Sequence, residues 1–357
     1  MSDTDLVNFK VGKIVCARWK VLEKLGAGGC GAVYEVTDIK NKGYTAALKV
    51  ESNNVDDGGV LKLEADVLKR LASRPNVIRL IHSGKRGKYS FIVMTLCGPD
   101  LMFLRRIAGR NANPRVDDKF SETTVLRVGV HALYAIKQVH EVGFAHRDVK
   151  PGNMVIGQYG HGARMIYTVD YGMVRSFVVR DEQGKLTFRK PRKRVLLRGT
   201  LRYCSTNVHK RIEQGRVDDM WSLLYMLVEL MAGLPWNSIR DEAQLQKMKE
   251  GITDDTLFQL CPPEFGAIAD HLRTLGYEDR PDYRLVYDQF MKGIKRIKAS
   301  FRDPFDWEDD KDIAEFMGTA ISISEKEIKN PLKGEELEWK MYPTTDPKRF
   351  EENILGM

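Results

Sequence analysis

Cysteine is scarce in this sequence: its 357 residues include only Cys16, Cys30, Cys97, Cys204 and Cys261, and no two of them form a C-x-x-C pair. Scattered thiols of this kind build neither a disulfide framework nor a zinc site of the paired-cysteine type. The first residues also have no apolar stretch typical of a secretory signal peptide. We therefore expect a reducing, intracellular setting and, within it, a cytoplasmic location.

Long apolar runs are absent as well. The longest, from Ser222 to Trp236, is interrupted by Glu229, Gly233 and Pro235, so its unbroken part is too short to span a bilayer. It predicts a buried core helix, and we expect no association with a membrane. The sequence contains no internal repeat, no long low-complexity stretch and no Pro/Ser-rich linker. At this length, one large two-lobed domain or two domains would fit.

The remaining composition is ordinary for a globular protein, with 43% hydrophobic and 30% charged residues. A net charge of +8 favours anionic partners without choosing among nucleic acid, a membrane surface and acidic protein. Residues 19–97 show strand periodicity with one helix, over Gly59–Leu71, whereas helical periods dominate from Leu101 onward. Beyond about residue 300 the sequence becomes acidic and irregular, which predicts a tail that lies on the domain or is partly disordered.

A glycine-rich stretch, LGAGGCGAVYEV at residues 25–36, is the first feature that points to chemistry. The same glycine spacing occurs in dinucleotide-binding folds, where a helix follows the glycines, and in a hairpin that covers nucleotide phosphates in protein kinases. Here the following residues, Ala32–Val36, alternate and include β-branched side chains, so they predict a strand. The hairpin is therefore favoured, although glycine clusters also occur in plain turns.

Residues needed for phosphoryl transfer then follow in order along the chain. Lys49, in AALKV, lies on an apolar strand from which its ammonium could reach the α- and β-phosphates of ATP, and Glu64 on the next helix is spaced to pair with it. Asp170, in YTVDYG, ends a later apolar strand and would bind magnesium. Taken alone, each residue also has an ordinary explanation. Lys49 could be a lysine at the edge of a sheet, Glu64 a solvated residue on a helix surface, and Asp170 part of a simple turn.

The most specific motif is FAHRDVKPGN at residues 144–153. In it, Asp148 is the candidate base beside the attacking hydroxyl, Lys150 would stabilise the transferring phosphate, and Asn153 would bind magnesium. Five residue types are fixed within eight positions, in register with the groups before and after them. The combined order predicts ATP-dependent phosphoryl transfer.

The sequence resembles the protein kinases, and one stretch narrows the resemblance. Where most of that superfamily have an A-P-E triplet, this chain has Ser205-Thr206-Asn207 in GTLRYCSTNVHK, which looks like the S-I-N-like triplet of the casein kinase 1 group. Within that group, the stretches RWKVLEKLGAGGCGAVYEV, VLKLEADVLKRL, GFAHRDVKPGN and DDMWSLLYMLVEL are similar to the tau-tubulin kinases. The resemblance covers about residues 11–310.

This resemblance implies an α+β, bilobal protein-kinase fold with a small β-rich N-lobe and a large α-helical C-lobe. The kinase domain would span residues 19–300, with the N-lobe at about 19–97 and the C-lobe at about 98–300, and extensions at 1–18 and 301–357. It also implies ATP and Mg2+ as cofactors, with Asn153 and Asp170 as the metal ligands. Met94 would lie behind the adenine, and residues 95–97 would form the hinge. The residues expected around ATP are Leu25, Gly26, Ala27, Gly28, Gly29, Cys30, Gly31, Val33, Ala47, Lys49, Met94, Thr95, Leu96 and Cys97.

One acidic residue is assigned a supporting role by the same resemblance. Asp219, in RVDDMWSL, resembles the buried acid that begins a large helix of the C-lobe and holds the backbone of the catalytic loop. Trp221, Leu224 and Val228 follow it at helical spacing and are predicted to be core positions.

A basic segment, Phe188–Arg202, contains seven cations and no acid. It has three interpretations: a solvated loop, a nuclear-import patch, or a surface that binds acidic or already phosphorylated substrates. The resemblance favours the third, since casein kinase 1 members are known for such substrates and Arg202 and Lys247 fall on that group's anion-site positions. The second interpretation keeps the nucleus as an alternative location.

Two functions remain open at this point. The first is a serine/threonine protein kinase, for which Lys150 is the typical residue two positions after the base, acting on acidic or phosphorylated proteins with cytoskeletal proteins among the candidates. The second is a pseudokinase-like scaffold that binds without turnover. The complete set of catalytic residues favours the first. We expect a monomer without specific nucleic-acid binding. We also expect that activity needs no phosphate on Thr187 or Thr200 of the activation segment, the stretch that the Ser205-Thr206-Asn207 triplet closes.

Overall fold

The computed structural model describes residues 7–28, 31–54, 59–111, 118–158, 160–311, 313 and 339–357. Gly29 and Cys30 of the expected ATP site therefore lie outside the described residues. The chain divides into two compact units: an N-terminal unit of residues 1–97 with 170–172, and a C-terminal unit of residues 98–169 with 173–357. The boundary between them falls directly after Cys97.

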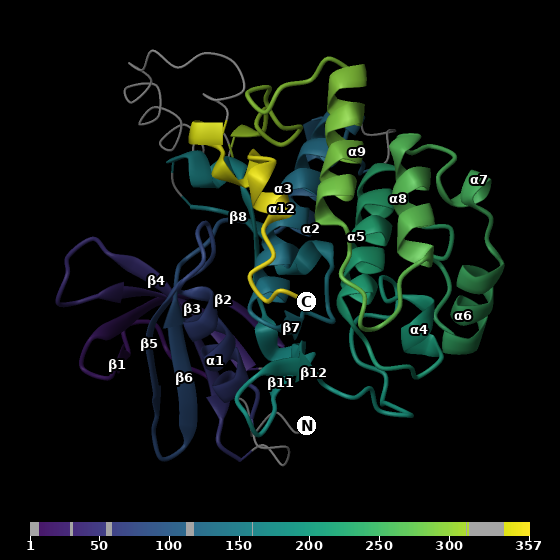
Figure 1. Cartoon of the computed structure of the whole chain (residues 1–357). Coiled ribbons are helices and arrows are strands. Elements are labelled where there is room, and N and C mark those ends of the chain that lie inside the picture. Colours follow the sequence, from purple (N-terminus) through teal and green to yellow (C-terminus); the bar gives the residue numbers. More distant parts are fainter. Residues whose placement is uncertain are drawn as a thin grey trace. The chain divides into compact units, whose positions relative to one another are not determined.

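The N-terminal unit contains one antiparallel sheet of six strands in the order β1-β2-β3-β4-β6-β5, together with the helix α1 (Figure 1). Its elements are β1 Ile14–Val15, β2 Trp19–Gly28, β3 Gly31–Asp38, β4 Thr45–Ser52, α1 Leu61–Leu71, β5 Leu80–Lys85 and β6 Tyr89–Met94. Along β3, burial alternates strictly, and Ala32, Tyr34 and Val36 are among its buried positions. This period of two agrees with the strand predicted after the glycines.

The glycine-rich stretch joins two antiparallel strands, β2 and β3, and no helix follows it, so the predicted hairpin is confirmed. The pairing of β2 with β3 runs up to Gly28 opposite Gly31. At Gly31 the backbone has φ +107°, and a Cβ there would lie 2.0 Å from the carbonyl oxygen of Val50 on β4. Only glycine fits this position, since both the dihedral and the close approach to β4 exclude a side chain.

The described residues before β2 pack onto this sheet. β1 pairs with β2, and Phe9 is 6% exposed, with its ring stacked 5.5 Å from that of Tyr34. The Tyr34 hydroxyl accepts a hydrogen bond from the Phe9 N–H at 2.9 Å. Residues 7–18 are therefore part of the same compact unit as the six-stranded sheet.

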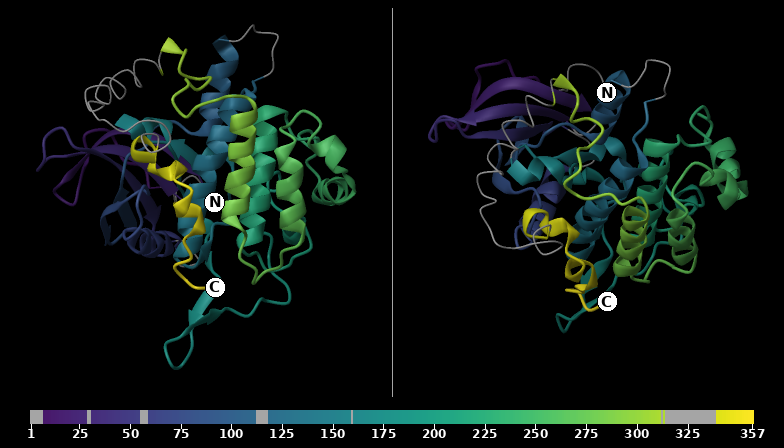
Figure 2. Two further views of the ribbon diagram at one scale, coloured as in Figure 1. Left: turned by 45° about the horizontal axis from the view of Figure 1, so that its top comes forward. Right: turned by 90° about the horizontal axis from the view of Figure 1, so that it is seen from above.

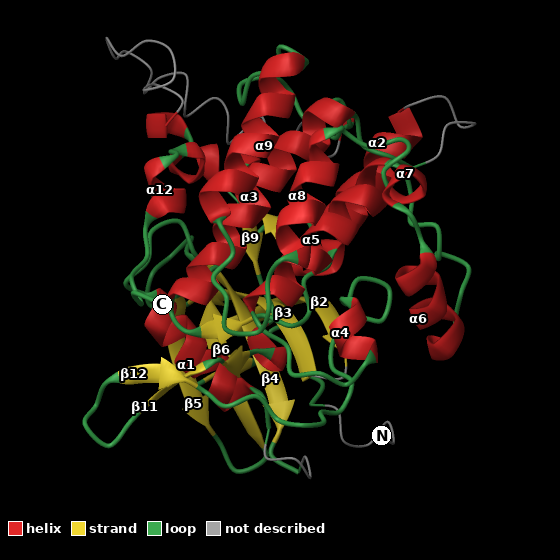
Figure 3. Ribbon diagram, turned by 45° about the vertical axis from the view of Figure 1, so that its right-hand side comes forward, coloured by secondary structure: helices red, strands yellow, loops and turns green. Residues whose placement is uncertain are grey.

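The C-terminal unit is mainly helical. Its helices are α2 Leu101–Asn111, α3 Glu122–Glu141, α4 Thr206–His209, α5 Arg216–Met231, α6 Glu242–Gly251, α7 Asp254–Leu257, α8 Glu264–Arg273, α9 Tyr283–Arg296 and α12 Lys348–Glu351. Helices α3, α5, α8 and α9 pack side by side, as Figure 3 shows, and α3 is buried along nearly all of its length. Ser121 caps α3, since its side chain accepts the N–H of Thr124 at 3.3 Å.

Helix α5 contains most of the longest apolar run and is the buried core helix that the sequence predicts. Leu224 and Val228 are 1% and 0% exposed. The prediction of Trp221 as a core position was wrong, because this residue is only partly buried and lines a pocket. Among the helices that the structure describes, none is long and apolar enough to cross a membrane.

Three short ladders and four 3-10 turns complete the described structure. The ladders pair β7 Phe144–Ala145 with β10 Arg175–Ser176, β8 Met154–Ile156 with β9 Ile166–Thr168, and β11 Val178–Arg180 with β12 Leu186–Phe188; the turns span Pro151–Asn153, Gly160–Arg164, Tyr171–Met173 and Pro343–Thr345. Residues 146–153 thus lie between β7 and β8, which hold both ends of this loop. In Figure 2 the β11–β12 hairpin stands away from the helices.

The described residues beyond 300 pack into the core of the C-terminal unit. Trp307 is 0% exposed, and its ring stacks 4.5 Å from that of Phe305. Phe350 on α12 is also 0% exposed and stacks 4.5 Å from Tyr287 on α9. These residues form part of one hydrophobic cluster with α3, α5 and α9, so residues 301–311 and 339–357 contribute to the stability of this unit.

Candidate active site

The lysine predicted to bind phosphate is held in a buried ion-pair network of the N-terminal unit. Lys49 on β4 is 5% exposed, and its Nζ lies 2.7 Å from Oε2 of Glu64 and 2.9 Å from Oδ1 of Asp170. Nearby, Glu51 accepts the N–H groups of Val60 and Leu61 at 3.0 and 3.2 Å. This side-chain cap fixes the start of α1 against β4, so that Glu64, one turn into the helix, meets Lys49.

Burial and ion pairing together determine the protonation states of Lys49 and Glu64. Burial alone would lower the pKa of Lys49, but the charges of Glu64 and Asp170 outweigh it and raise the pKa above its ordinary value. Burial raises the pKa of Glu64, and Lys49 counteracts part of that rise. Lys49 is therefore a permanent cation at neutral pH, as a phosphate-binding lysine must be.

Asp170 has an uncommon backbone conformation, with φ +63°. Non-glycine residues rarely adopt it, and such strain persists only where surrounding contacts hold it. Here Lys49 binds the Asp170 carboxylate, and the N–H of the next residue, Tyr171, donates to Oε1 of Glu64 at 3.4 Å. The Asp170 side chain is nevertheless 36% exposed, so a carboxylate predicted to bind magnesium is accessible to solvent.

The candidate base, Asp148, is held by four donors in the C-terminal unit. Thr200 donates to Oδ1 from its N–H at 2.9 Å and from its hydroxyl at 2.7 Å. Lys150 Nζ and Asn153 Nδ2 donate to Oδ2 at 2.7 and 3.1 Å. Asp148 is 7% exposed, so its carboxylate has one fixed orientation with the Lys150 ammonium beside it.

Asn153 fits its predicted role as a magnesium ligand by its hydrogen bonding. Its amide nitrogen donates to the backbone and side-chain oxygens of Asp148 at 2.9 and 3.1 Å, which leaves the amide oxygen as the ligand atom. Carboxylate and amide oxygens, the groups that Asp170 and Asn153 offer, are the hard donors that magnesium prefers. The donor types present in the two units therefore fit this ion.

Asp219 supports the catalytic loop, as the sequence predicts. It is 1% exposed at the start of α5, and it accepts the backbone N–H groups of His146 and Arg147 at 2.6 and 2.7 Å. His140 Nε2 lies 2.8 Å from the same carboxylate, and its Nδ1 lies 2.7 Å from the Tyr283 hydroxyl. Because Arg147 has φ +65°, the turn before Asp148 depends on these contacts.

The other residues expected around ATP belong to the N-terminal unit. They lie on β2, β3 and β4 and from the end of β6 to the unit boundary: Leu25, Gly26, Ala27, Gly28, Gly31, Val33, Ala47, Met94, Thr95, Leu96 and Cys97. Ala47 pairs with Met94 across β4 and β6, and both are 6% exposed. Leu25, by contrast, is 48% exposed on β2.

A buried acid that the sequence analysis missed neutralises part of the basic segment. Glu213 is 2% exposed and accepts from Arg192 at 2.6 and 2.9 Å, with Arg175 3.3 Å away. Burial alone would raise the pKa of Glu213, but its arginine partners outweigh burial and lower the pKa. Burial and the like charges of Arg175 and Arg192 lower the pKa of Arg147 to about 10.

The two predicted anion-site residues differ in their surroundings. Arg202 donates to the carboxylate of Glu229 at 2.9 Å, and Glu229 is 1% exposed, so this arginine already has an anionic partner. Lys247 is exposed on α6. Within the basic segment, Lys190, Lys193, Arg194 and Arg198 are also exposed, and no ion pair is formed by these four with any residue that the structure describes.

Comparison with known proteins agrees with this arrangement. The protein kinase domain family matches residues 19–284. A Caenorhabditis elegans protein whose name places it among the serine/threonine-protein kinases is 38% identical over 303 residues, which cover 85% of each chain. An inactive tau-tubulin kinase of the same organism is 35% identical over 257 residues, or 70% of this chain and 87% of that protein. Casein kinase I homolog 1 of Schizosaccharomyces pombe is 30% identical over 302 residues, or 82% of this chain and 65% of that protein.

These matches extend over the strands, helices and catalytic loop described above. They include the casein kinase 1 group, which the S-T-N triplet indicated, and a tau-tubulin kinase, the branch that the other quoted stretches indicated. The chain belongs to the protein kinase family, with the bilobal α+β fold of that family, and within it to the casein kinase 1 superfamily, where it resembles the tau-tubulin kinases.

Proposed function

We propose that this protein is an active serine/threonine kinase that transfers the γ-phosphoryl group of ATP to protein hydroxyls. The observation that carries the proposal is the ion pair between Lys49 and Glu64 at 2.7 Å, which protein kinases need in place for turnover. The ordered carboxylate of Asp148 supports it further. Membership of the family implies use of ATP and Mg2+ in general.

Each residue has a defined task in this reaction. ATP is the phosphoryl donor, and a bound magnesium ion would supply neutralisation of the charge that develops on the transferred group. Lys49 would hold phosphate oxygens, and Asn153 and Asp170 would provide oxygen ligands for the ion. Asp148 accepts the proton of the substrate hydroxyl, and the adjacent Lys150 ammonium stabilises the negative charge on the transferred group.

A scaffold without turnover is the second candidate, because one relative bears the name of an inactive tau-tubulin kinase. The test is incubation of the purified chain with Mg2+-ATP and casein, tubulin or tau, followed by mass spectrometry of the substrates. We expect phosphoserine or phosphothreonine on at least one of them. ATP binding without any transfer to the three proteins would favour the scaffold instead.

The substrates that we propose are acidic or phosphate-primed proteins. A pocket of about 500 Å3 lies beside Lys150 and Thr200, and its walls include Arg202 and Arg240. A peptide that brings a hydroxyl to Asp148 would meet these cations, and the exposed Lys247 on α6 adds to the positive charge of the C-terminal unit. Exposed charges act over about 8–10 Å at physiological salt, so the selected anion should lie close to the acceptor.

A paired peptide series tests this preference. The peptides are identical except for phosphoserine, aspartate or alanine a few residues before the acceptor. We expect wild type to prefer the anionic peptides by about ten-fold or more in kcat/KM, and the preference to shrink in Arg202→Ala/Lys247→Ala. Lys247→Ala alone is included because it leaves the buried Glu229 paired with Arg202.

The matched control is Lys185→Ala, which removes an exposed cation from the β11–β12 hairpin. It should keep the full preference. Equal use of the alanine peptide by wild type, or an undiminished preference in the double variant, would contradict the proposed anion selection and leave the segment as a solvated face or a nuclear-import patch.

We further propose that activity needs no phosphate on the activation segment. Glu213 already supplies a carboxylate to Arg175 and Arg192, and the Thr200 hydroxyl is bonded to Asp148 and Lys150. A phosphate on Thr200 would place a dianion against the Asp148 carboxylate. Protein treated with phosphatase and shown by mass spectrometry to be unphosphorylated should therefore be fully active, whereas activity that requires an added upstream kinase would contradict this.

The remaining expectations are also proposals: a monomer in the cytoplasm, with a kinase domain at residues 19–300. Light scattering of the purified chain tests the first, and imaging of the tagged protein in cells tests the second.

A further inference from the structure

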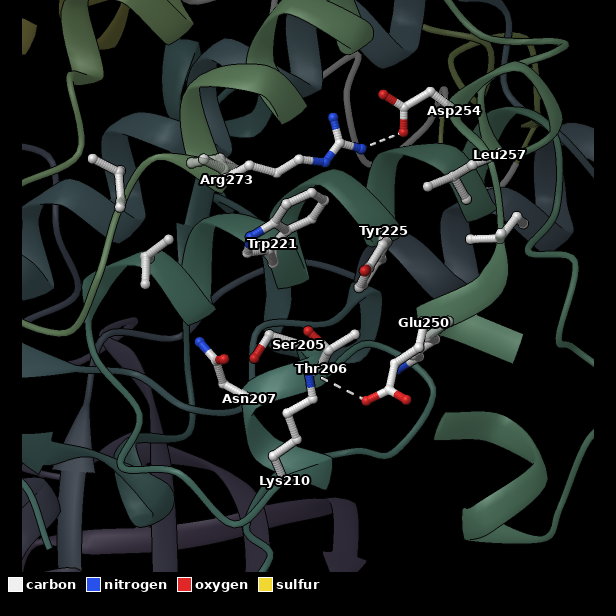
Figure 4. Close-up of a pocket in the computed structure, with 15 residues that line it drawn as sticks. Ser205, Thr206, Asn207, Lys210, Trp221, Tyr225, Glu250, Asp254, Leu257 and Arg273 are labelled. Carbon is white, nitrogen blue, oxygen red and sulfur yellow. Dashed lines mark hydrogen bonds and ion pairs between the residues drawn. The ribbon is translucent and has the colours of Figure 1, made fainter. Parts of the chain in front are cut away.

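A second pocket of the C-terminal unit is not used by the proposed reaction. Its volume is about 640 Å3, and its walls come from α5, the ends of α6 and α8, α7, and residues 205–210 (Figure 4). A cavity of this size lies in the range of sites that hold an organic ligand or several side chains. All of its lining residues belong to the described part of this one unit.

Two aromatic rings one helical turn apart form the middle of this pocket. The ring centroids of Trp221 and Tyr225 are 5.6 Å apart, with a tilt of 36°, and Figure 4 shows the two side chains next to each other. Val217, Leu257 and Leu272 add apolar surface. Aromatic faces and edges of this kind favour a further aromatic ring as the ligand.

The polar atoms of both rings are open to the pocket. Within the described part of the chain, neither the hydroxyl of Tyr225 nor the indole N–H of Trp221 makes a hydrogen bond, and neither is among the buried polar atoms that lack a partner, so solvent in the pocket can reach both. Tyr283, which is 1% exposed, instead bonds His140 at 2.7 Å. A ligand that displaces water from these two donors must replace the hydrogen bonds that are lost, so an acceptor group suits it.

The charges around the pocket favour an anionic acceptor. Arg273 pairs with Asp254, and Lys210 lies 3.4 Å from Glu250, but these four side chains are 35–49% exposed and can exchange partners at little cost. Lys249 is different: it is 5% exposed, and its Nζ donates to the carbonyl oxygens of Leu201 and Cys204 at 2.7 and 2.6 Å. It adds a cation that no carboxylate of the lining residues neutralises, so a carboxylate beside the aromatic ring would be stabilised.

The pocket also lies close to the catalytic loop along the chain. Residues 205–210 of its wall directly follow the segment that starts at Thr200, which bonds to Asp148. Five residues can span at most about 18 Å. Lys249, a wall residue, is bonded to the carbonyl groups of the same segment. A polypeptide that places its hydroxyl at Asp148 can therefore reach the pocket with residues from the same stretch of chain.

We propose that this pocket is a docking site for a segment of the protein substrate in which an aromatic residue stands next to Asp or Glu. The ring would pack on Trp221 and Tyr225, and the carboxylate would accept from their N–H and O–H groups. This inference rests on the proposed kinase function, because it takes the docked protein to be the one that is phosphorylated.

Selection from a displayed library of random 12-residue peptides tests the binding. The immobilised proteins are wild type, Tyr225→Phe, Ile252→Glu, which places a carboxylate in the pocket wall, and Leu260→Glu, which makes the same class of change at a 64% exposed site outside it. We expect wild type and Leu260→Glu to enrich peptides with an aromatic–acidic pair, and Ile252→Glu to enrich none. Enrichment without that pair, or equal enrichment on Ile252→Glu, would overturn the proposal.

Kinetics then separate docking from catalysis. An enriched segment is joined to an acceptor peptide through linkers of different length, and the KM of each fusion is compared with that of the acceptor peptide alone. The best fusion should have a KM about ten-fold lower with wild type and Leu260→Glu, an advantage about five-fold smaller with Tyr225→Phe, and none with Ile252→Glu. The acceptor peptide alone should be used equally by all four proteins.

The outcomes distinguish the two proposals. If no protein phosphorylates the acceptor peptide while the library still selects the motif, the kinase function fails and the pocket remains a binding site. If the acceptor peptide is phosphorylated but no fusion lowers KM, or the advantage persists in Ile252→Glu, the kinase function stands and the docking inference is wrong.

Discussion

Asp148→Asn should lower kcat by about 100-fold or more, the usual scale for loss of a positioned base. The substitution keeps the size of the side chain but removes the carboxylate that would accept the hydroxyl proton. It also places an amide N–H2 where Thr200 and Lys150 now donate. Because that interaction is made in the transition state, kcat and kcat/KM should fall together, with little change in KM for ATP.

The measurement is a steady-state phosphorylation assay at saturating Mg2+-ATP, with ATP binding followed separately by fluorescence or calorimetry. Asp309→Asn is the matched control, because it makes the same change at an exposed acid. It should retain wild-type kcat. Near wild-type turnover by Asp148→Asn would show that Asp148 is not the base, and equal loss in both variants would indicate a general effect of the substitution on folding.

Most of what could be predicted of the fold and of the candidate site came from patterns within short stretches of sequence. The alternation of buried and exposed residues in β3 was enough to predict the glycine hairpin. The roles of Lys49, Glu64 and Asp148 were predicted from short motifs that occur in the order a kinase requires. The contact of Asp219 with the catalytic loop spans 73 positions, and no local pattern marks it: its role was predicted only from the resemblance to the protein kinases.

Long-range pairings could not be predicted in this way. Glu213 meets Arg192 from 21 positions away, and neither residue has a local pattern that marks it. Lys249 looks like an ordinary charged residue on α6, yet it is buried because two backbone carbonyl groups accept its hydrogens. Trp221 has helical spacing with core residues, but spacing alone does not show whether a neighbouring segment covers the ring. Such contacts depend on the tertiary arrangement of several segments.

The second large effect expected is a loss of stability in mild acid, which arises from buried histidines. His131 on α3 is 1% exposed, with Nδ1 2.6 Å from the Thr344 hydroxyl. Burial, with a smaller contribution from the charge of Arg127, lowers its pKa to about 3. Burial and the charge of Lys249 likewise lower the pKa of His209 to about 4. Both histidines are therefore neutral in the folded protein at pH 5.

The direction of this pH effect follows from the coupling between proton binding and folding. An unfolded histidine has a pKa near 6.5, so below that pH the unfolded chain binds protons that the folded chain excludes, and the free energy of unfolding falls as pH falls. Between pH 7.5 and 5 each histidine should cost about 2 kcal/mol. Asp218 acts in the opposite direction, because burial raises its pKa to about 6 and the folded state gains a proton there. It should offset about 1.4 kcal/mol, so that these three groups together account for a loss of about 2–3 kcal/mol.

Urea unfolding followed by tryptophan fluorescence at a series of pH values from 7.5 to 5 measures this loss. His131→Asn can still bond the Thr344 hydroxyl but cannot titrate, so its stability should decline by about 2 kcal/mol less than that of wild type over this range, whatever its stability at pH 7.5. Gln183→Asn, which introduces the same side chain at an exposed position without a titratable group, is the matched control and should decline like wild type. An unchanged pH dependence in His131→Asn would show that His131 takes up its proton in the folded protein, and that its burial between α3 and residues 343–345 is looser than the structure has it.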